Sequence, residues 1–131
     1  MCQEASHTIL VVEDDQQIRS FLTPALRCEG YTVQEAEDGA AAIHTLDRAA
    51  NSICLMVLDM GLPLVDGAQV LQHTRTGNPR LPVIAISADA RRLAAAKAAG
   101  ARATLAKPFL VADLLQIIES CQLGSVGASP A

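Results

Sequence analysis

Short apolar runs alternate with helix-like segments along the chain, and this alternation constrains the fold more than any other feature. Five of the runs are typical of strands and lie at 9–12, 31–36, 53–58, 82–87 and 102–106. Between them, apolar residues recur at helical spacing and the connections are short. Strands that alternate with helices in this way pair in parallel through right-handed crossovers. The sequence therefore predicts an α/β fold, in which an open parallel sheet carries helices on both faces.

The pattern within each run indicates where its strand lies in the sheet. The run 53–58 is continuously apolar, which is typical of a central strand covered on both faces. The run 31–36 alternates polar and apolar residues, so we expect it at an edge. The run 102–106 carries the weakest strand signal of the five.

The first helical segment has recognisable ends in the sequence. Asp15 is suited to cap its N-terminus, and Gly30 is expected to end it. Pro24 lies inside the segment and should kink the helix or cost it a hydrogen bond. The other expected helices cover 38–50, 89–99 and the segments that begin at Gly67 and near Val111.

The composition argues against several classes of function. The chain has 131 residues, about the size of one domain, and half of them are hydrophobic, but only 2% are aromatic. So few aromatic side chains argue against stacking on single-stranded nucleic acid. A net charge of −4 and a pI near 5.2 argue against direct binding to nucleic acid or to a membrane surface. Because no secretory signal and no apolar stretch of about 20 residues is visible, we expect a cytoplasmic protein without membrane insertion.

The four cysteines are scattered, at positions 2, 28, 54 and 121, and none belongs to a C-x-x-C pair. This spacing argues against a metal site built from sulfur. We therefore expect buried or idle thiols at all four positions, as is usual in a reducing cytoplasm.

The ends of the strand-like runs are rich in polar side chains. The residues there are Glu13, Asp14 and Asp15 after the first run, Asp59 after the third, Ser87 and Ala88 at the fourth, and Lys107 and Pro108 after the fifth. The carboxyl ends of parallel strands meet at one edge of the sheet, where ligands of such folds bind. Two carboxylates about 4 Å apart repel each other by roughly 4 kcal/mol at an effective dielectric near 20. A hard cation such as Mg²⁺ would remove most of this repulsion, so the edge predicts a metal-dependent phosphoryl-transfer site.

Four segments, in this order, resemble the receiver domain of two-component response regulators such as the chemotaxis regulators: ILVVEDD, LMVLDMGLPLVDG, VIAISA and LAKPF. The spacing also fits, because successive members of the series Asp14, Asp59, Ser87 and Lys107 are 45, 28 and 20 positions apart. The resemblance covers 7–122 as a receiver domain and leaves 123–131 as a flexible C-terminal tail or the start of a linker. It implies a flavodoxin-like, doubly wound (βα)5 fold with strand order 2-1-3-4-5.

The resemblance implies a chemical role for the acidic residues. Asp59 would accept a phosphoryl group from a histidine kinase or a histidine phosphotransfer protein, and the domain itself would catalyse this transfer and the later hydrolysis. Mg²⁺ would be bound by Glu13, Asp14, Asp59 and the backbone carbonyl of Gly61. The phosphorylated domain would then act on a downstream effector protein or on a fused output domain.

The resemblance also assigns the residues that respond to the phosphoryl group. Lys107 would pair with Asp59 and then with the phosphoryl group, and its bond to Pro108 would be cis. Ser87, which is followed by Ala88, would turn to bond a phosphoryl oxygen.

Three positions bear on the rate and the output of the switch. Asp89 and Gly61 stand where the family tunes hydrolysis of the phosphoryl group. Thr104 stands at the switch position where many receivers carry Tyr or Phe, so the coupling to the hydroxyl must be altered or carried by backbone and helix movement.

Other interpretations of the same residues have to be weighed against this one. A pseudo-receiver, a protein-interaction module that phosphorylation does not regulate, would keep the fold and lose the switch. The acidic pair, Asp59, Ser87 and Lys107 argue against it, whereas Thr104 leaves it some room. A phosphatase of the haloacid dehalogenase type would need a second aspartate at Gly61 and is rejected. The basic residues Arg91, Arg92, Lys97 and Arg102 are interpreted as a solvated face rather than a partner site.

Overall fold

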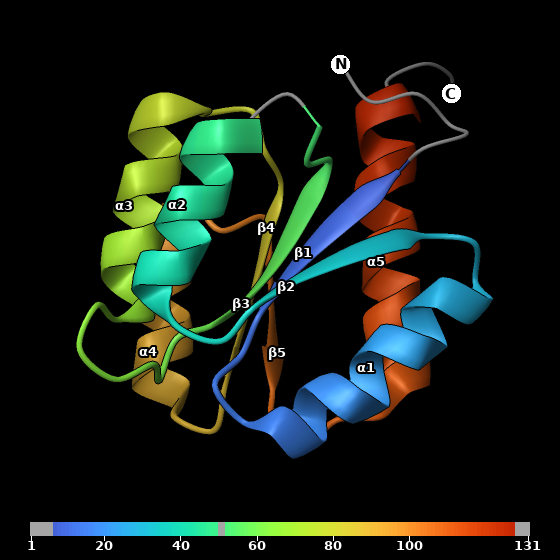
Figure 1. Ribbon diagram of the computed structural model, residues 1–131, viewed down its shortest axis with the longest axis horizontal. Helices are drawn as coiled ribbons and strands as arrows, with labels where there is room; N and C mark the ends of the chain where they lie inside the picture. Colours follow the sequence, from blue (N-terminus) through green and yellow to red (C-terminus); the bar gives the residue numbers. More distant parts are fainter. Residues whose placement is uncertain (1–6, 50–51, 128–131) are drawn as a thin grey trace.

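The computed structural model describes residues 7–49 and 52–127 and contains a five-stranded parallel sheet (Figure 1). The strands are β1 (Thr8–Val12), β2 (Thr32–Ala36), β3 (Leu55–Asp59), β4 (Val83–Ser87) and β5 (Ala103–Ala106). The helices are α1 (Gln16–Cys28), α2 (Gly39–Ala49), α3 (Gly67–Gly77), α4 (Ala90–Ala98) and α5 (Val111–Gly127). The strand order is β2-β1-β3-β4-β5, which confirms the predicted flavodoxin-like fold.

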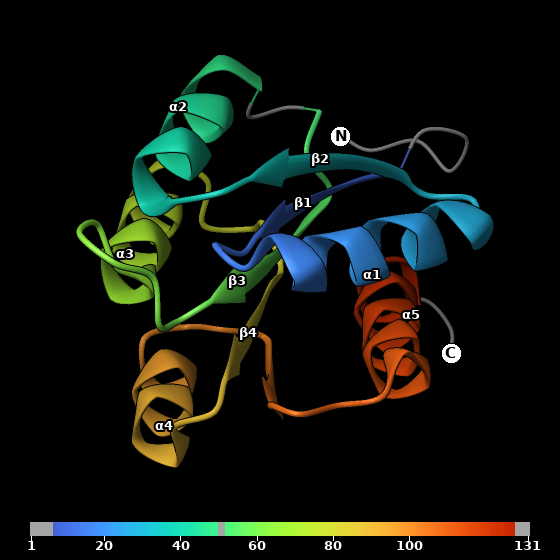
Figure 2. The same cartoon turned by 60° about the horizontal axis from the view of Figure 1, so that its bottom comes forward.

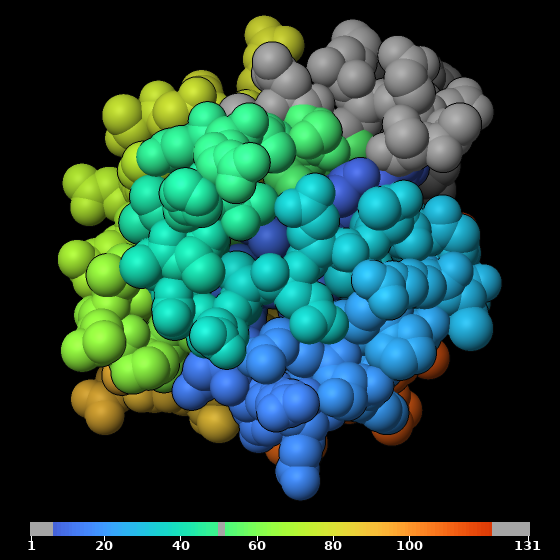
Figure 3. Space-filling view, in the orientation of Figure 1, coloured from blue at the N-terminus to red at the C-terminus, as the bar shows by residue number. Residues whose placement is uncertain are grey.

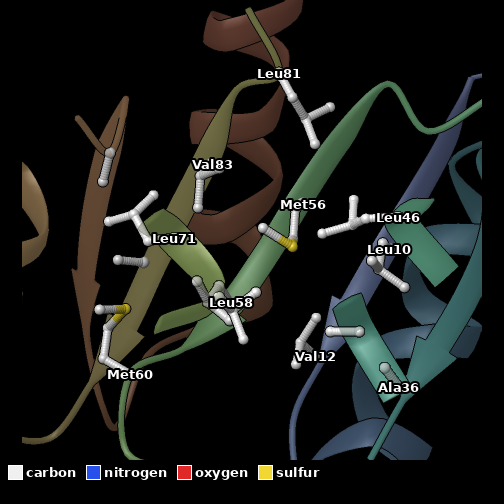
Figure 4. Close-up of a cluster of buried hydrophobic side chains, with 14 of the residues drawn as sticks. Leu10, Val12, Ala36, Leu46, Met56, Leu58, Met60, Leu71, Leu81 and Val83 are labelled. Atoms are coloured by element: carbon white, nitrogen blue, oxygen red, sulfur yellow. The ribbon is translucent and has the colours of Figure 1, made fainter. Parts of the chain in front are cut away.

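Helices cover both faces of the sheet, as Figures 1 and 2 show: α1 and α5 lie on one face, and α2, α3 and α4 lie on the other. Each face has its own aliphatic core. The core under α2, α3 and α4 is centred on Leu10, Met56 and Leu58 (Figure 4). The core under α1 and α5 includes Ile9 and Ile84. Alternate residues of each strand therefore point into different cores, which is the period expected of a strand.

The strands differ in burial in the way the sequence predicts. Every residue of β1, β3 and β4 is buried, whereas β2 alternates and lies at one edge. Side chains of β2 reach the surface between α1 and α2 in the space-filling view (Figure 3). The other edge strand, β5, is half-buried to exposed along its length, which accounts for its weak apolar signal.

The ends of the elements follow local chemistry. The Asp15 side chain caps α1 by accepting a hydrogen bond from the backbone N–H of Gln17 at 2.8 Å. The helix continues through Pro24 and ends before Gly30, whose φ of +95° suits glycine. The third strand begins at Leu55, two residues later than predicted, because its pairing with β1 starts there.

Gly67 brings α3 against the carboxyl end of β3. A Cβ atom at this position would lie 2.5 Å from the Cα of Met60 and 2.8 Å from the backbone oxygen of Asp59. A side chain there would force the helix away from the strand, so the glycine lets α3 begin in direct contact with the end of β3. The same helix is capped by Asp66, which forms a reciprocal capping box with Gln69.

Three further predictions concern the cysteines, the membrane and the tail. Cys54 is disulfide-bonded, so the expectation of a thiol there is wrong, while Cys28 and Cys121 are free thiols and Cys2 lies outside the described residues. Within the described residues, the helices are too short or too polar to cross a membrane. The helix α5 continues to Gly127 into the expected tail, residues 128–131 lie outside the described residues, and the boundaries 7–122 and 123–131 stay predictions.

Candidate functional site

The carboxyl ends of β1 and β3 bring three carboxylates together at one edge of the sheet, which Figure 2 turns toward the viewer. Oxygen atoms of Glu13, Asp14 and Asp59 all lie within 4.8 Å of one another. Glu13 and Asp59 are buried, and Asp14 is exposed. Because β1 and β3 are adjacent parallel strands in which Val12 is paired with Leu58, the residues that follow in each strand must meet.

Glu13 is fully buried, and its pKa departs from that of an ordinary glutamate. Burial raises its pKa to about 7; the Lys107 ammonium opposes this rise, and the negative charge of Asp59 adds to it. Its Oε2 atom accepts a hydrogen bond from the backbone N–H of Asp15 at 3.2 Å. Its buried Oε1 atom has no hydrogen bond of good geometry, although the Lys107 ammonium lies 3.0 Å away.

Lys107 joins the two buried carboxylates. Its Nζ atom lies 3.0 Å from Oε1 of Glu13 and 3.4 Å from Oδ2 of Asp59. Burial lowers the pKa of Lys107, but the contacts with Glu13 and the charge of Asp59 outweigh it, so the pKa is raised and the ammonium stays charged. The residue follows β5, and its peptide bond to Pro108 is cis.

The Asp59 carboxylate has a different neighbour at each oxygen. Oδ2 faces the Lys107 ammonium, and Oδ1 accepts a hydrogen bond from the backbone N–H of Gly61 at 2.9 Å. The side chain of Asp59 is only 6% exposed. A nearly buried carboxylate with fixed partners at both oxygens is oriented before any reactant arrives.

Ser87 ends β4, next to β3, and is buried. Its hydroxyl accepts a hydrogen bond at 2.9 Å from the backbone N–H of Asp89, which caps α4. Ala88 lies between the two and is exposed. Thr104 lies on β5 opposite Ala85 of β4 and is half-buried.

The donor set suits a divalent cation. Three carboxylates converge, two of them buried, and oxygen ligands at this density are what Mg²⁺ prefers. The predicted ligands Glu13, Asp14 and Asp59 are thus brought together, with Gly61 two residues beyond Asp59 in the same loop.

Comparison with known proteins decides the family. The model of the response regulator receiver domain matches residues 9–119. The chain belongs to this family. It is therefore a response regulator receiver domain of two-component signalling.

Individual relatives agree with this assignment. The response regulator MprA of Mycobacterium ulcerans is 36% identical over 109 residues, which cover 82% of this chain and 46% of MprA. The chain thus spans about half the length of the curated relatives that it matches. A response regulator receiver domain protein from Clostridium thermocellum superposes with a TM-score of 0.84 at 26% identity, covering 88% of this chain and 93% of that one. NtrX from Brucella abortus gives 0.81 at 28% identity, covering 88% of this chain and 27% of NtrX.

Two arginines beside the site were not predicted to take part in it. Arg19 of α1 donates to the backbone carbonyl of Glu13 at 2.6 Å, and Arg92 of α4 donates to that of Met60 at 2.7 Å. The basic residues of α4 and its flanks are all exposed, as predicted, but Arg92 is also bonded. Neither contact can be predicted from the sequence. Every residue has a backbone carbonyl, so the residue types of Glu13 and Met60 do not indicate that an arginine binds there.

Proposed function

We propose that this receiver domain is switched by Mg²⁺-dependent transfer of a phosphoryl group to Asp59. The observation that carries the proposal is the pairing of one lysine with two buried carboxylates. Lys107 lies within 3.4 Å of both Glu13 and Asp59, and Asp14 adds a third carboxylate at the solvent side. A site with this charge pattern can neutralise an incoming phosphoryl group and a metal ion together.

The transfer step balances without any further reactant. An oxygen of the Asp59 carboxylate forms a bond to phosphorus while the bond from phosphorus to the donor's histidine nitrogen breaks. The imidazole leaves with that electron pair and takes up a proton. Hydrolysis later returns Asp59 and inorganic phosphate as water attacks phosphorus. Positioning and charge neutralisation supply most of the catalysis in such transfers.

Each residue of the site has a separate task in this proposal. Glu13, Asp14, Asp59 and the Gly61 carbonyl would hold Mg²⁺, which supplies charge neutralisation at the phosphoryl oxygens when bound. Lys107 would move its ammonium from the carboxylates to a phosphoryl oxygen.

Ser87 would report the phosphoryl group. Its hydroxyl would leave the backbone N–H of Asp89 and bond a phosphoryl oxygen, so the first turn of α4 would lose a contact. Thr104 is too small to fill an aromatic pocket, so the movement of α4 would take over the part of the switch that an aromatic side chain has elsewhere. Asp89, which is half-exposed, and Gly61 would influence the access of water to the acyl phosphate.

Receiver domains of response regulators interact with kinases and with output domains. For this chain, we propose a histidine kinase or phosphotransfer protein as donor, acting in the cytoplasm. A shallow cavity of about 380 Å³ supports a docking place for the donor, because it is mainly apolar and is lined by Lys107, which contacts Asp59. Phe21, which is 56% exposed, lines this cavity together with Ile18 and Phe109. The output would be a partner protein or a fused domain.

The decisive experiment is the intact mass of the chain after incubation with acetyl phosphate, with and without Mg²⁺. We expect the gain of one phosphoryl group in the wild type, no gain without Mg²⁺, and no gain in Asp59→Asn. Asp113→Asn is the matched control, because it removes an exposed carboxylate in the first turn of α5 and should leave the gain unchanged.

Fast hydrolysis would hide a transient acyl phosphate, so the same samples are titrated with beryllium fluoride, a stable mimic of the phosphoryl group. A Mg²⁺-dependent shift of the Ser87 amide resonance is then expected. No mass gain and no shift would contradict the proposal and favour the pseudo-receiver.

A further inference from the structure

We propose that Arg92 is a positioning residue for phosphoryl transfer, acting on Asp59 through the peptide group between Met60 and Gly61. This inference rests on the proposed function, because it assigns a residue to the same reaction. The sequence placed Arg92 on a solvated face, and half of its side chain is indeed exposed. Its guanidinium, however, reaches the loop that follows Asp59.

The geometry consists of two hydrogen bonds to one peptide group. The guanidinium of Arg92 donates to the carbonyl oxygen of Met60 at 2.7 Å. The N–H of the same peptide group belongs to Gly61 and donates to Oδ1 of Asp59 at 2.9 Å. The guanidinium and the acceptor carboxylate are therefore attached to opposite ends of one peptide plane.

Because the peptide group is planar, the bond from Arg92 to the Met60 carbonyl also restrains the Gly61 N–H. We call this restraint the brace. Rotation about the peptide C–N bond is hindered, so the C=O and N–H groups point in opposite directions and move together. Holding the Met60 carbonyl therefore fixes the direction in which the Gly61 N–H points. A glycine would otherwise allow this peptide to turn, because its backbone has the most freedom of any residue.

The charge of Arg92 adds to the effect. A cation at a carbonyl oxygen polarises the peptide group and makes its N–H a stronger donor. The stronger donor holds Oδ1 of Asp59 and leaves Oδ2 facing Lys107 at 3.4 Å. Arg92 thereby fixes the rotation of the carboxylate, which decides how the attacking oxygen meets phosphorus.

Arg92 also forms an ion pair with the residue that contacts the hydroxyl of Ser87. Its Nε atom lies 3.8 Å from Oδ2 of Asp89, and the backbone N–H of Asp89 donates to Ser87. The first turn of α4 thus touches the acceptor through Arg92 and the hydroxyl through Asp89. A movement of this turn after phosphorylation would change the brace, so Arg92 would act before the transfer and be released after it.

The neighbouring Arg91 provides a matched control. It has the same charge, is exposed, and stands in the same turn, but its side chain makes no hydrogen bond or ion pair with the part of the chain that the structure describes. Removing either charge changes the net charge equally, whereas only the change at Arg92 removes the brace.

The test compares Arg92→Gln, Arg92→Lys and Arg91→Gln with the wild type in two measurements. The first is the rate of phosphorylation at saturating acetyl phosphate and Mg²⁺. We expect it to fall about tenfold in Arg92→Gln, less in Arg92→Lys, and not at all in Arg91→Gln. The second is the Gly61 amide proton resonance in the unphosphorylated protein, which should move upfield in Arg92→Gln because its hydrogen bond weakens.

The outcomes separate this proposal from the proposed function. A wild-type rate and an unmoved Gly61 resonance in Arg92→Gln would overturn the brace, and an equal loss in Arg91→Gln would show a general charge effect and overturn it as well. Thermal unfolding at an unchanged temperature excludes a folding defect. If the wild type takes up no phosphoryl group, the proposed function and the role of Arg92 in transfer fail together, and the Gly61 resonance alone decides whether the brace exists.

Discussion

Two sides of the site differ in how they are built. On the acidic side, Glu13 and Asp59 follow or end the strands β1 and β3, whose residues are all buried. On the other side, β5 has no fully buried residue and α4 buries only Ala96. The carboxylates lie at the ends of tightly packed strands, whereas Arg92 and the Asp89 cap that contacts Ser87 belong to the loosely packed helix α4. Segments with little buried surface open at low free energy, so the loose side is suited to move.

The largest expected effect is on the free energy of unfolding, when a leucine is shortened on each side of the site. Leu10 of β1 is fully buried, and Leu93 of α4 is half-buried against the same core. We expect Leu10→Ala to lower the free energy of unfolding by about 3 to 5 kcal/mol and Leu93→Ala by about 1 kcal/mol. Urea titration of both variants measures this difference, and equal losses would remove the distinction between the two sides.

Lys107 links the two sides, because it follows β5 and binds the carboxylates that follow β1 and β3. Lys107→Met should reduce the rate of phosphorylation by acetyl phosphate about 100-fold, since Glu13 and Asp59 lose their counter-charge. Lys97→Met serves as the control, because Lys97 is exposed and binds only the backbone carbonyl of Arg102 among the described residues. A rate unchanged in Lys107→Met would show that the metal alone neutralises the acidic side.

Glu13 makes the acidic side dependent on pH when no metal is present. Its pKa is raised from 4.5 to about 7, so the folded state binds a proton more tightly than the unfolded state. The stability that Glu13 contributes therefore falls as the pH rises from about 4.5 through 7. Glu13→Gln, which mimics the protonated form, should be more stable than the wild type by about 2 kcal/mol at pH 8.

The difference in stability between Glu13→Gln and the wild type should shrink toward pH 5. Thermal or urea unfolding in a chelating buffer, repeated across this range, measures it. A difference that grows on acidification would have the wrong sign and would contradict the effect of burial on Glu13.

Burial leaves a pattern in the sequence, and this pattern predicted the α/β class and the places of individual strands, whereas the resemblance to receiver domains implied the strand order. The continuous apolar run of β3 and the alternating run of β2 predicted a central and an edge strand, and both predictions are confirmed. The strand ends then brought Glu13, Asp59 and Lys107 to one edge, where the structure has them in contact. Side chains at the carboxyl ends of parallel strands lie at the same edge of the sheet, whatever the details of packing. This part of the site can therefore be predicted from the topology alone.

The sequence was insufficient where a contact depends on a long side chain or on the backbone. The bond from Arg92 to Met60 spans 32 positions and ends on a carbonyl, so no pairing of residue types reveals it. The perturbed pKa of Glu13 depends on a burial that three adjacent acidic residues would not suggest. The disulfide at Cys54 was missed for a similar reason, because scattered cysteines do not indicate which of them approach each other.

The difference between the two sides is tested most directly by backbone NMR during stepwise addition of Mg²⁺ and then beryllium fluoride. Mg²⁺ alone should shift the amides beside the carboxylates, from Glu13 to Asp15 and from Asp59 to Gly61. Beryllium fluoride should then shift Ser87, the first turn of α4 and Thr104 on β5, while the centres of β1 and β3 stay unmoved. Shifts confined to the acidic side after both additions would contradict the account, because the loose side would then not respond to the phosphoryl group.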